Sequence, residues 1–276
     1  MRPLARAIGS HAPSRGTVTG TRRTTLHATM NNAPDLRRLE ELGLNASAPP
    51  GQLLYDGWLL RLLPGQAKRA RSVNALYPST LPLPDKIRYC EQLYRRHALP
   101  MVFRITPFSE PWGLDAELGR LGYPRFDTTA VESAAIDLQA TGTWDVDILP
   151  LVDWVEAVGS LRKSPVLFRH AHLERLQGTP LARSALVVRQ DGQIVAAGLT
   201  MVEDGWAGLF DIVTAPAARQ QGFGRQIVES LLRCAWDLGA RHAYLQVGAD
   251  NTAARQLYAR YGFRERYHYW YRGHSE

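Results

Sequence analysis

The sequence predicts an α/β fold, because strand-like apolar runs alternate with amphipathic helical runs from residue 34 onward. Two observations carry this prediction. Residues 209–239 read as a strand that ends at Pro216, a loop, and a helix that opens at Gly222. A second strand, residues 242–248, and a second helix then follow.

The first of these helices has one apolar face, and its beginning is a predicted anion site. The apolar face repeats every three or four residues, at Phe223, Ile227, Leu231 and Leu238. N–H groups of a first helical turn lack partners within the helix, and the helix dipole adds positive potential there. Gly222 and Gly224 leave room for a ligand, and Arg219 and Arg225 add charge. The loop therefore suits a pyrophosphate.

The glycine spacing excludes two nucleotide-binding folds and resembles a third pattern. Arg219-x-x-Gly222-x-Gly224 is neither G-x-G-x-x-G nor a P-loop, since no Lys-Ser or Lys-Thr follows. It resembles the R/Q-x-x-G-x-G/A loop of the GCN5-related N-acetyltransferases (GNATs). From Asn251 to Phe263 the chain also resembles that family's N-x-x-A-x-x-L-Y-x-x-x-G-F block. On these two blocks the chain is identified as a member of the GNAT superfamily.

The resemblance implies both a fold and an activity. The fold is a central mixed, mostly antiparallel sheet flanked by helices. The activity is that of an acyltransferase, which uses acetyl-CoA as co-substrate and moves the acetyl group directly to a primary amine. In this family the pantetheine arm fits where two parallel strands splay, here residues 206–214 and 243–247. Pro216 suits such a splay, because it cannot donate to a ladder.

The remaining elements are read from local patterns. Strands are expected over residues 55–63, 69–77 and 101–105, helices over residues 85–97, 151–161 and 170–176, and a hairpin around Asp191 and Gly192. The first half repeats the order strand, helix ending in Gly-aromatic, strand, with residues 100–106, 114–123 and 126–132 matching 243–247, 254–263 and 265–271.

The first half lacks the phosphate loop. Residues 77–84 stand where 215–224 stand in the second half, but they contain three prolines and no R-x-x-G-x-G, so we expect no acetyl-CoA there. Leu118 takes the place of Tyr258. The expected organisation is a disordered basic tail over 1–33, a degenerate GNAT-like domain over 34–139, and an acetyl-CoA-binding catalytic GNAT domain over 140–276.

The resemblance also assigns site residues. Backbone groups at the end of the central strand would hold the pantetheine and acetyl portion, at Ile212, Val213 and Thr214. The pyrophosphate would lie on the loop formed by Gln220, Gln221, Gly222, Phe223, Gly224 and Arg225. Tyr258 matches the position that protonates the leaving thiolate, although a packed aromatic is the alternative. Asn251 is expected to cap its helix, to reach the pantetheine, or both.

The general base is not fixed by the sequence. In the ribosomal-protein alanine acetyltransferase branch a Glu serves as base, and the matching residue here, Gln246, cannot accept a proton at neutral pH. Asp211 is the candidate nearest the thioester in sequence, with Glu203 and Asp204 as others. Asp211 can equally be a carboxylate satisfied by its neighbours. The histidines show no metal spacing and are interpreted as solvated or packed, namely His170, His172, His242 and His268.

Composition limits the function classes. The net charge is +7, but residues 1–29 hold five arginines and no acid, so the rest of the chain carries an ordinary +2 and nucleic acid is not an expected partner. The tail reads either as a transit peptide or as an extension before a start at Met30, which we favour. Cys90 and Cys234 lie in apparent helices without metal-ligand spacing, which favours a reduced, cytoplasmic protein with no metal. No run is long enough to span a membrane.

The acceptor is the least defined part of the prediction. A small-molecule or peptide amine is expected, and the aromatic residues 267–271 either line the acceptor cleft or pack in the core. A catalytically silent acyl-CoA-binding or sensing module is the alternative function, supported only by Gln246. A nucleic-acid-associated protein acting through its Arg-rich tail ranks third. The oligomeric state is not indicated by the sequence.

Overall fold

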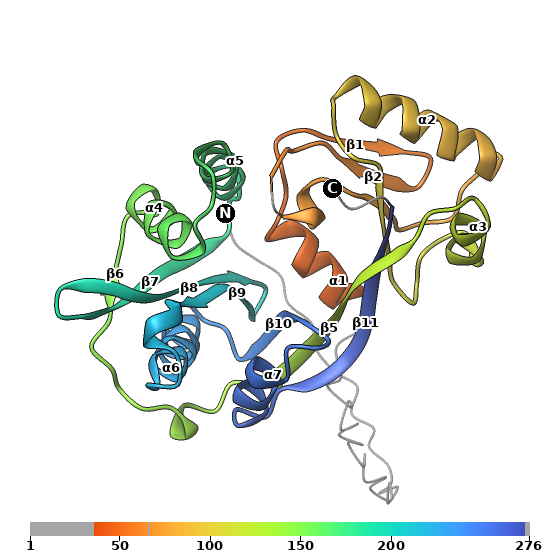
Figure 1. Cartoon of the computed structure of the whole chain (residues 1–276). Helices are drawn as coiled ribbons and strands as arrows, with labels where there is room; N and C mark the ends of the chain where they lie inside the picture. The colour runs from red at the N-terminus through yellow and green to blue at the C-terminus, as the bar shows by residue number, and fades with distance from the viewer. Residues whose placement is uncertain (1–35, 66, 274–276) are drawn as a thin grey trace, which may run out of the picture. The chain divides into compact units, whose positions relative to one another are not determined.

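The computed structural model of the chain describes residues 36–65 and 67–273, and Figure 1 shows its ribbon. The predicted tail, residues 1–33, lies outside the described residues. Within the described part, no helix combines the length and the apolar composition that crossing a membrane requires.

Seven α-helices and eleven strands make up the described residues. The helices are α1 (Leu36–Asn45), α2 (Leu83–Arg96), α3 (Leu114–Arg120), α4 (Leu151–Arg162), α5 (Val166–Gln177), α6 (Phe223–Asp237) and α7 (Thr252–Ala259). The strands are β1 (Gln52–Tyr55), β2 (Trp58–Arg61), β3 (Val73–Ala75), β4 (Val102–Ile105), β5 (Arg125–Ala135), β6 (Asp147–Ile148), β7 (Ala182–Gln190), β8 (Gln193–Glu203), β9 (Trp206–Thr214), β10 (His242–Gly248) and β11 (Arg264–Gly273).

These strands form one sheet in the order β1-β2-β3-β4-β11-β5-β10-β9-β8-β7-β6. Only β3 beside β4 and β9 beside β10 are parallel among the described strands. The sheet separates two cores in the second half, because successive residues of a strand face opposite sides. Val187 packs in the core that contains Trp154 of α4, whereas Leu186 packs in the core that contains Leu231 of α6. The predicted α/β fold with a mixed, mostly antiparallel sheet flanked by helices is therefore confirmed.

Strands β5 and β11 are exchanged between the two halves of the chain. β5 belongs to the first half but lies between β10 and β11, with Val131 opposite both Gln246 and Tyr267. β11 ends the second half but pairs with β4, where Trp270 lies opposite Ile105. Figure 1 shows these two long strands side by side. Each half thus completes the sheet of the other, and Pro34–Glu276 forms one compact unit.

The element order repeats in the two halves as the sequence predicts. A parallel pair of strands joined by a helix, β3-α2-β4 or β9-α6-β10, is followed by a short helix and a long strand, α3-β5 or α7-β11. Gly122 and Gly262 follow the two short helices with φ of +85° and +78°. This left-handed conformation ends helices readily at glycine. The division into domains 34–139 and 140–276 stays a prediction, because the shared strands cross it.

Three local predictions need correction. The strand expected over residues 55–63 is the hairpin β1-β2, which turns at Asp56 and Gly57 with φ of +42° and +83°; two such residues make a tight hairpin turn. The strand expected over residues 69–77 is a 3₁₀ turn followed by the short β3. The helix expected over residues 170–176 begins earlier, at Val166, because Pro165 precedes its first turn.

Helix α6 is fixed to the sheet by its apolar face. Ile227, Val228 and Leu231 are fully buried, and each such aliphatic side chain contributes about 1.5–3 kcal/mol to the free energy of unfolding. Gly198 of β8 allows the close approach, because a Cβ there would lie 2.5 Å from Cγ2 of Ile227. This packing holds α6 against β7, β8 and β9.

Candidate active site

A β-bulge bends the central strand β9 near its end. Ala197 pairs with Val213 and Leu199 pairs with Phe210, so Asp211 and Ile212 together face the single residue between the two partners. Asp211 has φ of +53°, which is left-handed. A bulge of this kind redirects a side chain and increases the local twist. Here it turns Asp211 out of the regular alternation of the strand.

Beyond the bulge, β9 and β10 separate. Their parallel ladder ends at Leu209 and Leu245, although the strands continue to Thr214 and Gly248. The predicted splay is therefore present at the expected strand ends. Ile212, Val213 and Thr214 therefore belong to the part of β9 that does not pair with β10.

The loop after β9 presents a row of free backbone donors. Gln220 and Gly222 have φ of +62° and +88°, and Gly222 begins α6 without a side-chain cap. Within the part of the chain that the structure describes, the N–H groups of residues 220–225 donate no hydrogen bond, whereas the next one, of Gln226, already bonds to the Gly222 carbonyl oxygen. A row of unpaired N–H groups at a helix N-terminus is suited to an anion.

The side chains of the loop contribute less charge than the sequence suggests. Nε of Arg225 is 2.8 Å from Oε1 of the buried Glu229, so this guanidinium is already paired. Arg219 is exposed and makes no ion pair with a described residue. A Cβ at Gly222 would meet open space, so the demand for glycine there comes from its φ. A Cβ at Gly224 would lie 3.7 Å from Thr214 Oγ1, facing the end of β9.

Glu229 ties the start of α6 to the segment before β6. Its carboxylate accepts hydrogen bonds from Gly142 N, Trp144 Nε1, Arg225 Nε and Tyr261 Oη. Burial opposes ionisation, but these donors prevail and lower the pKa of Glu229 to about 2. The buried, ionised carboxylate of Glu229 therefore links the first turn of α6 to the neighbouring segments.

Tyr258 and Asn251 lie on the helix after β10. The Tyr258 side chain is 8% exposed, and its hydroxyl makes no hydrogen bond with a described residue. Burial, together with the charge of Glu132, raises the pKa of Tyr258 to about 12, so the phenol is protonated at neutral pH. Oδ1 of Asn251 accepts a hydrogen bond from Ala254 N at 3.2 Å, which is the predicted helix cap.

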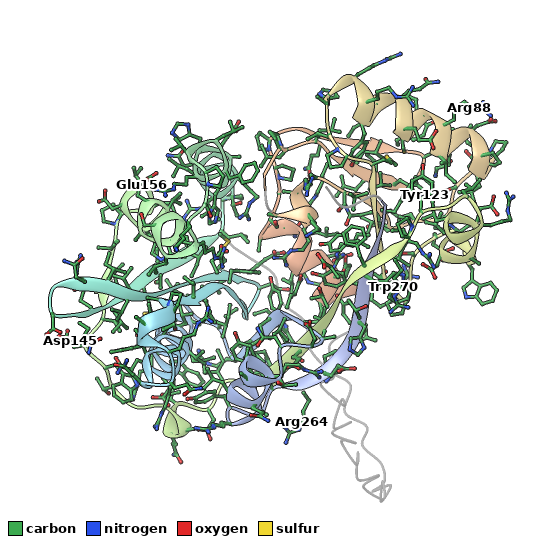
Figure 2. The ribbon with its side chains drawn as sticks, in the orientation of Figure 1. Arg88, Tyr123, Asp145, Glu156, Arg264 and Trp270 are labelled. Carbon is green, nitrogen blue, oxygen red and sulfur yellow. The ribbon has the colours of Figure 1, made fainter. Side chains whose placement is uncertain are left out.

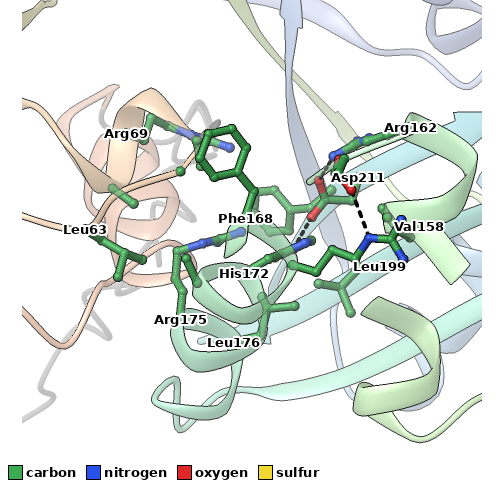
Figure 3. A pocket seen from close by; sticks show the side chains of 18 of the residues that line it. Leu63, Arg69, Val158, Arg162, Phe168, His172, Arg175, Leu176, Leu199 and Asp211 are labelled. Atoms are coloured by element: carbon green, nitrogen blue, oxygen red, sulfur yellow. Dashed lines mark hydrogen bonds and ion pairs between the residues drawn. The ribbon is translucent and has the colours of Figure 1, made fainter. Parts of the chain in front are cut away.

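A cavity of about 220 Å³ lies beside the bulge (Figure 3). Its walls come from α4, α5, β8 and β9 of the second half and, in the first half, from Ala46, residues 63–65 and residues 67, 69 and 70. Asp211 stands in its wall. Oδ1 of Asp211 is 2.6 Å from Nη1 of Arg162, and Oδ2 is 3.1 Å from Nε2 of His172.

These contacts decide the state of the Asp211 carboxyl. Burial alone would raise its pKa, but His172, Arg162 and Arg175 hold it well below 3.8. Asp211 is therefore ionised and a weak base at neutral pH. Asp211 has two interpretations, a catalytic base or a carboxylate satisfied by its neighbours. Its contacts agree with the second.

Comparison with known proteins gives the family. Residues 33–272 match the family described as "Probable histone acetyltransferase Rv0428c C-terminal". The chain belongs to this acetyltransferase family. Over 238 residues it is 28% identical to the uncharacterized N-acetyltransferase YobR of Bacillus subtilis (strain 168), which covers 83% of this chain and 94% of that protein.

A shorter stretch of this acetyltransferase is similar to a further enzyme. Over 76 residues it is 37% identical to the ribosomal protein bS18-alanine N-acetyltransferase of Escherichia coli (strain K12), covering 28% of this chain and 51% of that protein. The fold resembles a GCN5-related N-acetyltransferase from Kribbella flavida, with a TM-score of 0.63, 16% identity, and coverage of 87% and 95%. It also resembles a tandem GNAT protein from the clavulanic acid biosynthesis pathway, with a TM-score of 0.52, 16% identity, and coverage of 88% and 97%.

The chain is thus a GNAT superfamily member and an N-acetyltransferase, as the two motif blocks predict. Of the sequence-based base candidates, the acetyltransferase places only Asp211 in the cavity wall. Glu203 is the last residue of β8, beside the start of β9, where its Oε1 is 3.0 Å from Arg38 Nη2, and Asp204 pairs with the same arginine. Neither lines the cavity.

Gln246 has a structural use in this enzyme. Its Oε1 accepts hydrogen bonds from Arg69 Nη1 and from Tyr269 Oη, the latter at 3.0 Å, and its Nε2 is buried without a partner among the described residues. Gln246, which the sequence resemblance matches to a glutamate base, therefore binds an arginine of the first half. Of the aromatic residues 267–271, the tyrosines are buried in the core.

Sequence reasoning missed His172 and the arginines of the cavity. His172 is interpreted there as packed or solvated, yet it contacts Asp211 from α5. A signal was present: Phe168, His172 and Arg175 recur at the spacing of one helical face, and α5 directly precedes the strand β7 of the second half. Elsewhere in the described residues, no three His, Cys, Asp or Glu side chains gather as a metal site would require.

Proposed function

We propose that this N-acetyltransferase uses acetyl-CoA and transfers the acetyl group directly to a primary amine of a small molecule or peptide. The observation that carries the proposal is the row of unpaired N–H groups over residues 220–225, which adjoins the splay between β9 and β10. A pyrophosphate on these donors would direct the pantetheine arm between the unpaired ends of β9 and β10, beside Ile212, Val213 and Thr214. Arg219 would add charge at the rim of the loop, and Asn251 would stand at the other side.

Bound acetyl-CoA supplies a thioester, whose C–S bond breaks as the amine nitrogen forms the new C–N bond. N–H groups at the end of β9 would polarise the carbonyl. Tyr258 would give its proton to the departing sulfur. Its raised pKa keeps the hydroxyl protonated at neutral pH until that step. Its free hydroxyl fits this role, since no described residue binds it.

The amine must lose a proton before or during the attack. We assign this proton to His172, with Asp211 as the carboxylate that positions the imidazole through Nε2. The other ring nitrogen, Nδ1, has no partner among the described residues and would accept the proton. This assignment keeps Asp211 in the catalytic machinery, but as a positioning group rather than the base.

The first half would shape the acceptor side without binding acetyl-CoA. At the start of α2 the anion position is taken by a side chain of the protein: Asp56 accepts hydrogen bonds from Thr80 N at 2.9 Å and Leu81 N at 3.0 Å. Lys86 Nζ lies 3.2 Å from the same carboxylate. We propose that residues 34–139 are a degenerate GNAT-like domain and residues 140–276 the catalytic one.

The similarity to the ribosomal protein bS18-alanine enzyme does not extend to its base position. Gln246 is neutral and is held by Arg69 and Tyr269. We therefore do not propose a ribosomal-protein acceptor for this chain.

Calorimetric titration of acetyl-CoA into the full chain tests the proposal. We expect binding near one per chain, abolished by Gly222→Glu, which places bulk and negative charge on the loop. Gly192→Glu is the matched control, since Gly192 also has a left-handed φ, of +78°, and open space at its Cβ, but lies in the β7-β8 turn. The absence of binding to the folded chain would refute the proposed function.

A further inference from the structure

The cavity beside Asp211 carries an excess of positive charge. Four arginines line it, namely Arg69, Arg162, Arg169 and Arg175, and Asp211 is the only acidic residue among the described residues of its lining. Figure 3 shows Arg69 and Arg175 extending from opposite elements toward the space beside Phe168. The question is which of these charges are already neutralised within the protein.

Two of the four arginines have carboxylate partners. Arg162 is 2.6 Å from Asp211, and Arg169 is 2.8 Å from Glu156. Asp211 and Glu156 therefore neutralise two of the four arginines, Arg162 and Arg169. The acceptor does not need to neutralise them.

The other two arginines bond only neutral oxygens. Arg69 donates to Oε1 of Gln246, and Arg175 donates to Oγ of Ser47 at 3.3 Å. Among the residues that the structure describes, no carboxylate lies within ion-pair distance of either guanidinium. The cavity therefore keeps two guanidinium groups with no carboxylate in direct contact, although the charge of Asp211 still acts on Arg175 from beyond ion-pair distance.

Arg175 is also buried. Only 8% of Arg175 is exposed, and burying a charge without an ion-pair partner lowers the free energy of unfolding. Burial lowers the pKa of Arg175 to about 10; the charge of Asp211 opposes this shift, and repulsion from Arg69 and Arg162 adds to it, so the group is still charged at neutral pH. Buried charges with perturbed pKa values cluster at functional sites, so an anionic group of a ligand is the candidate partner of this guanidinium.

We propose that the acceptor is a small amine that also carries an anionic group, with a carboxylate as the best match to the planar guanidinium of Arg175. The anion would lie between Arg175 and Arg69, and the amine would face His172 and the thioester. The volume of about 220 Å³ suits a molecule of amino-acid size. This proposal rests on the proposed function, because it names the substrate class of the same site.

Matched acceptors give the first test, with the full chain, acetyl-CoA and a readout of released CoA thiol. Each pair contains an amine with an anion and the same amine without it: alanine and ethylamine, phenylalanine and 2-phenylethylamine, lysine and cadaverine. Phosphoethanolamine and ethanolamine form the pair that separates phosphate from carboxylate. We expect kcat/KM to be at least about tenfold higher for the anionic members, and highest for carboxylates. Equal use of both members, or preference for cadaverine, would overturn the proposal.

Variants then assign the effect to the unpaired arginines. Arg175→Gln and Arg69→Gln should each lower the ratio of kcat/KM between anionic and non-anionic members by about tenfold to a hundredfold. Arg169→Gln removes a lining arginine that has its own carboxylate, and should change that ratio by less than about threefold. Arg175→Lys keeps a charge at this depth and should retain part of the discrimination. A ratio unchanged in Arg175→Gln contradicts the proposal.

Anion binding without turnover provides an independent test. Sodium acetate and inorganic phosphate are titrated into Gly222→Glu, whose loop no longer accepts phosphates, and into Gly222→Glu combined with Arg175→Gln. We expect saturable binding in the first protein and its loss in the second; no binding in either would overturn the proposal. Because this test needs no acetyl-CoA, retained anion binding in a chain that fails to bind acetyl-CoA would refute the proposed function alone.

Discussion

Nε2 of His172 lies 3.1 Å from Oδ2 of Asp211, although the two residues are 39 positions apart and belong to α5 and β9. The bulge in β9 makes the contact possible, because it turns Asp211 toward the helices on one face of the sheet. A carboxylate that holds an imidazole in one orientation leaves the opposite ring nitrogen for a substrate. His172 is therefore the proposed base, and Asp211 is the group proposed to orient its imidazole.

Replacement of His172 should affect catalysis more than cofactor binding. We expect His172→Gln to lower kcat by about 10²-fold, the lower end of what a general base contributes, with the dissociation constant of acetyl-CoA unchanged. Asp211→Asn should lower kcat about tenfold, since the imidazole stays but loses its orientation. Steady-state kinetics and calorimetry on the same preparations measure both effects. A larger loss in Asp211→Asn than in His172→Gln would instead make Asp211 the base.

Tyr258 offers a separate test of the leaving-group side. Its hydroxyl makes no hydrogen bond with a described residue, so Tyr258→Phe should leave the free energy of unfolding within about 0.5 kcal/mol of the wild-type value. If the phenol protonates the thiolate, kcat should fall about 10²-fold while acetyl-CoA affinity is nearly kept. Thermal melts, calorimetry and turnover with any acceptor found in the screen measure the three quantities. Parallel loss of affinity and turnover would indicate a packing role.

The elements of the proposed cofactor site could be predicted from the sequence, because they are encoded locally. The loop around Gly222, the helix behind it and the block from Asn251 to Phe263 each lie within a few consecutive turns of chain. The acceptor side could not be predicted in this way. Arg69 meets Gln246 across 177 positions, and this contact depends on the exchange of β5 and β11, which no local pattern specifies.

The histidine and arginines of α4 and α5 show the same limit. Helical spacing places Phe168, His172 and Arg175 on one face, but the spacing alone does not say whether that face meets solvent, a core or a cavity. Their proposed role follows from the bulge in β9 and from residues 63–65, 67, 69 and 70 of the other half, which line the cavity. Both are tertiary features.

The strand exchange predicts that the halves do not fold separately. Residues 34–139 alone would leave β4 and β5 without β11 between them, and residues 140–276 alone would leave an open edge on β10. Unpaired edges and exposed residues such as Val131, which is fully buried in the whole chain, favour aggregation. We expect each half to lack cooperative unfolding by circular dichroism, and co-expression of both to restore it. A cooperative melt of either half by itself would contradict this expectation.

Glu229 should make stability depend on pH in the acidic range. Its folded pKa of about 2 lies below the ordinary 4.5, so its contribution is fully present above pH 4.5 and is lost as the pH falls toward 2. At pH 7 this corresponds to about 3 kcal/mol, and Glu229→Gln should lower the free energy of unfolding by roughly that amount. Urea denaturation at pH 7 and pH 3 should show a smaller difference from wild type at the lower pH. Asp147→Asn, at an exposed ion pair with Arg189, is the control and should change stability by less than about 1 kcal/mol.

Removal of the charge at Arg175 should stabilise the ligand-free protein while impairing its use of acceptors. The guanidinium is buried near Arg69 and Arg162 with no carboxylate within ion-pair distance, and an apolar side chain of similar length avoids that cost. We expect Arg175→Met to raise the melting temperature by about 2 °C or more, as about 1 kcal/mol does in a chain of this size. Differential scanning calorimetry measures this shift. The same replacement at Arg104, whose guanidinium forms a buried pair with Glu40, should lower the melting temperature, because it leaves that carboxylate alone. A fall in both variants would mean that Arg175 serves the fold, and its lack of an internal counter-charge would then have no bearing on the acceptor.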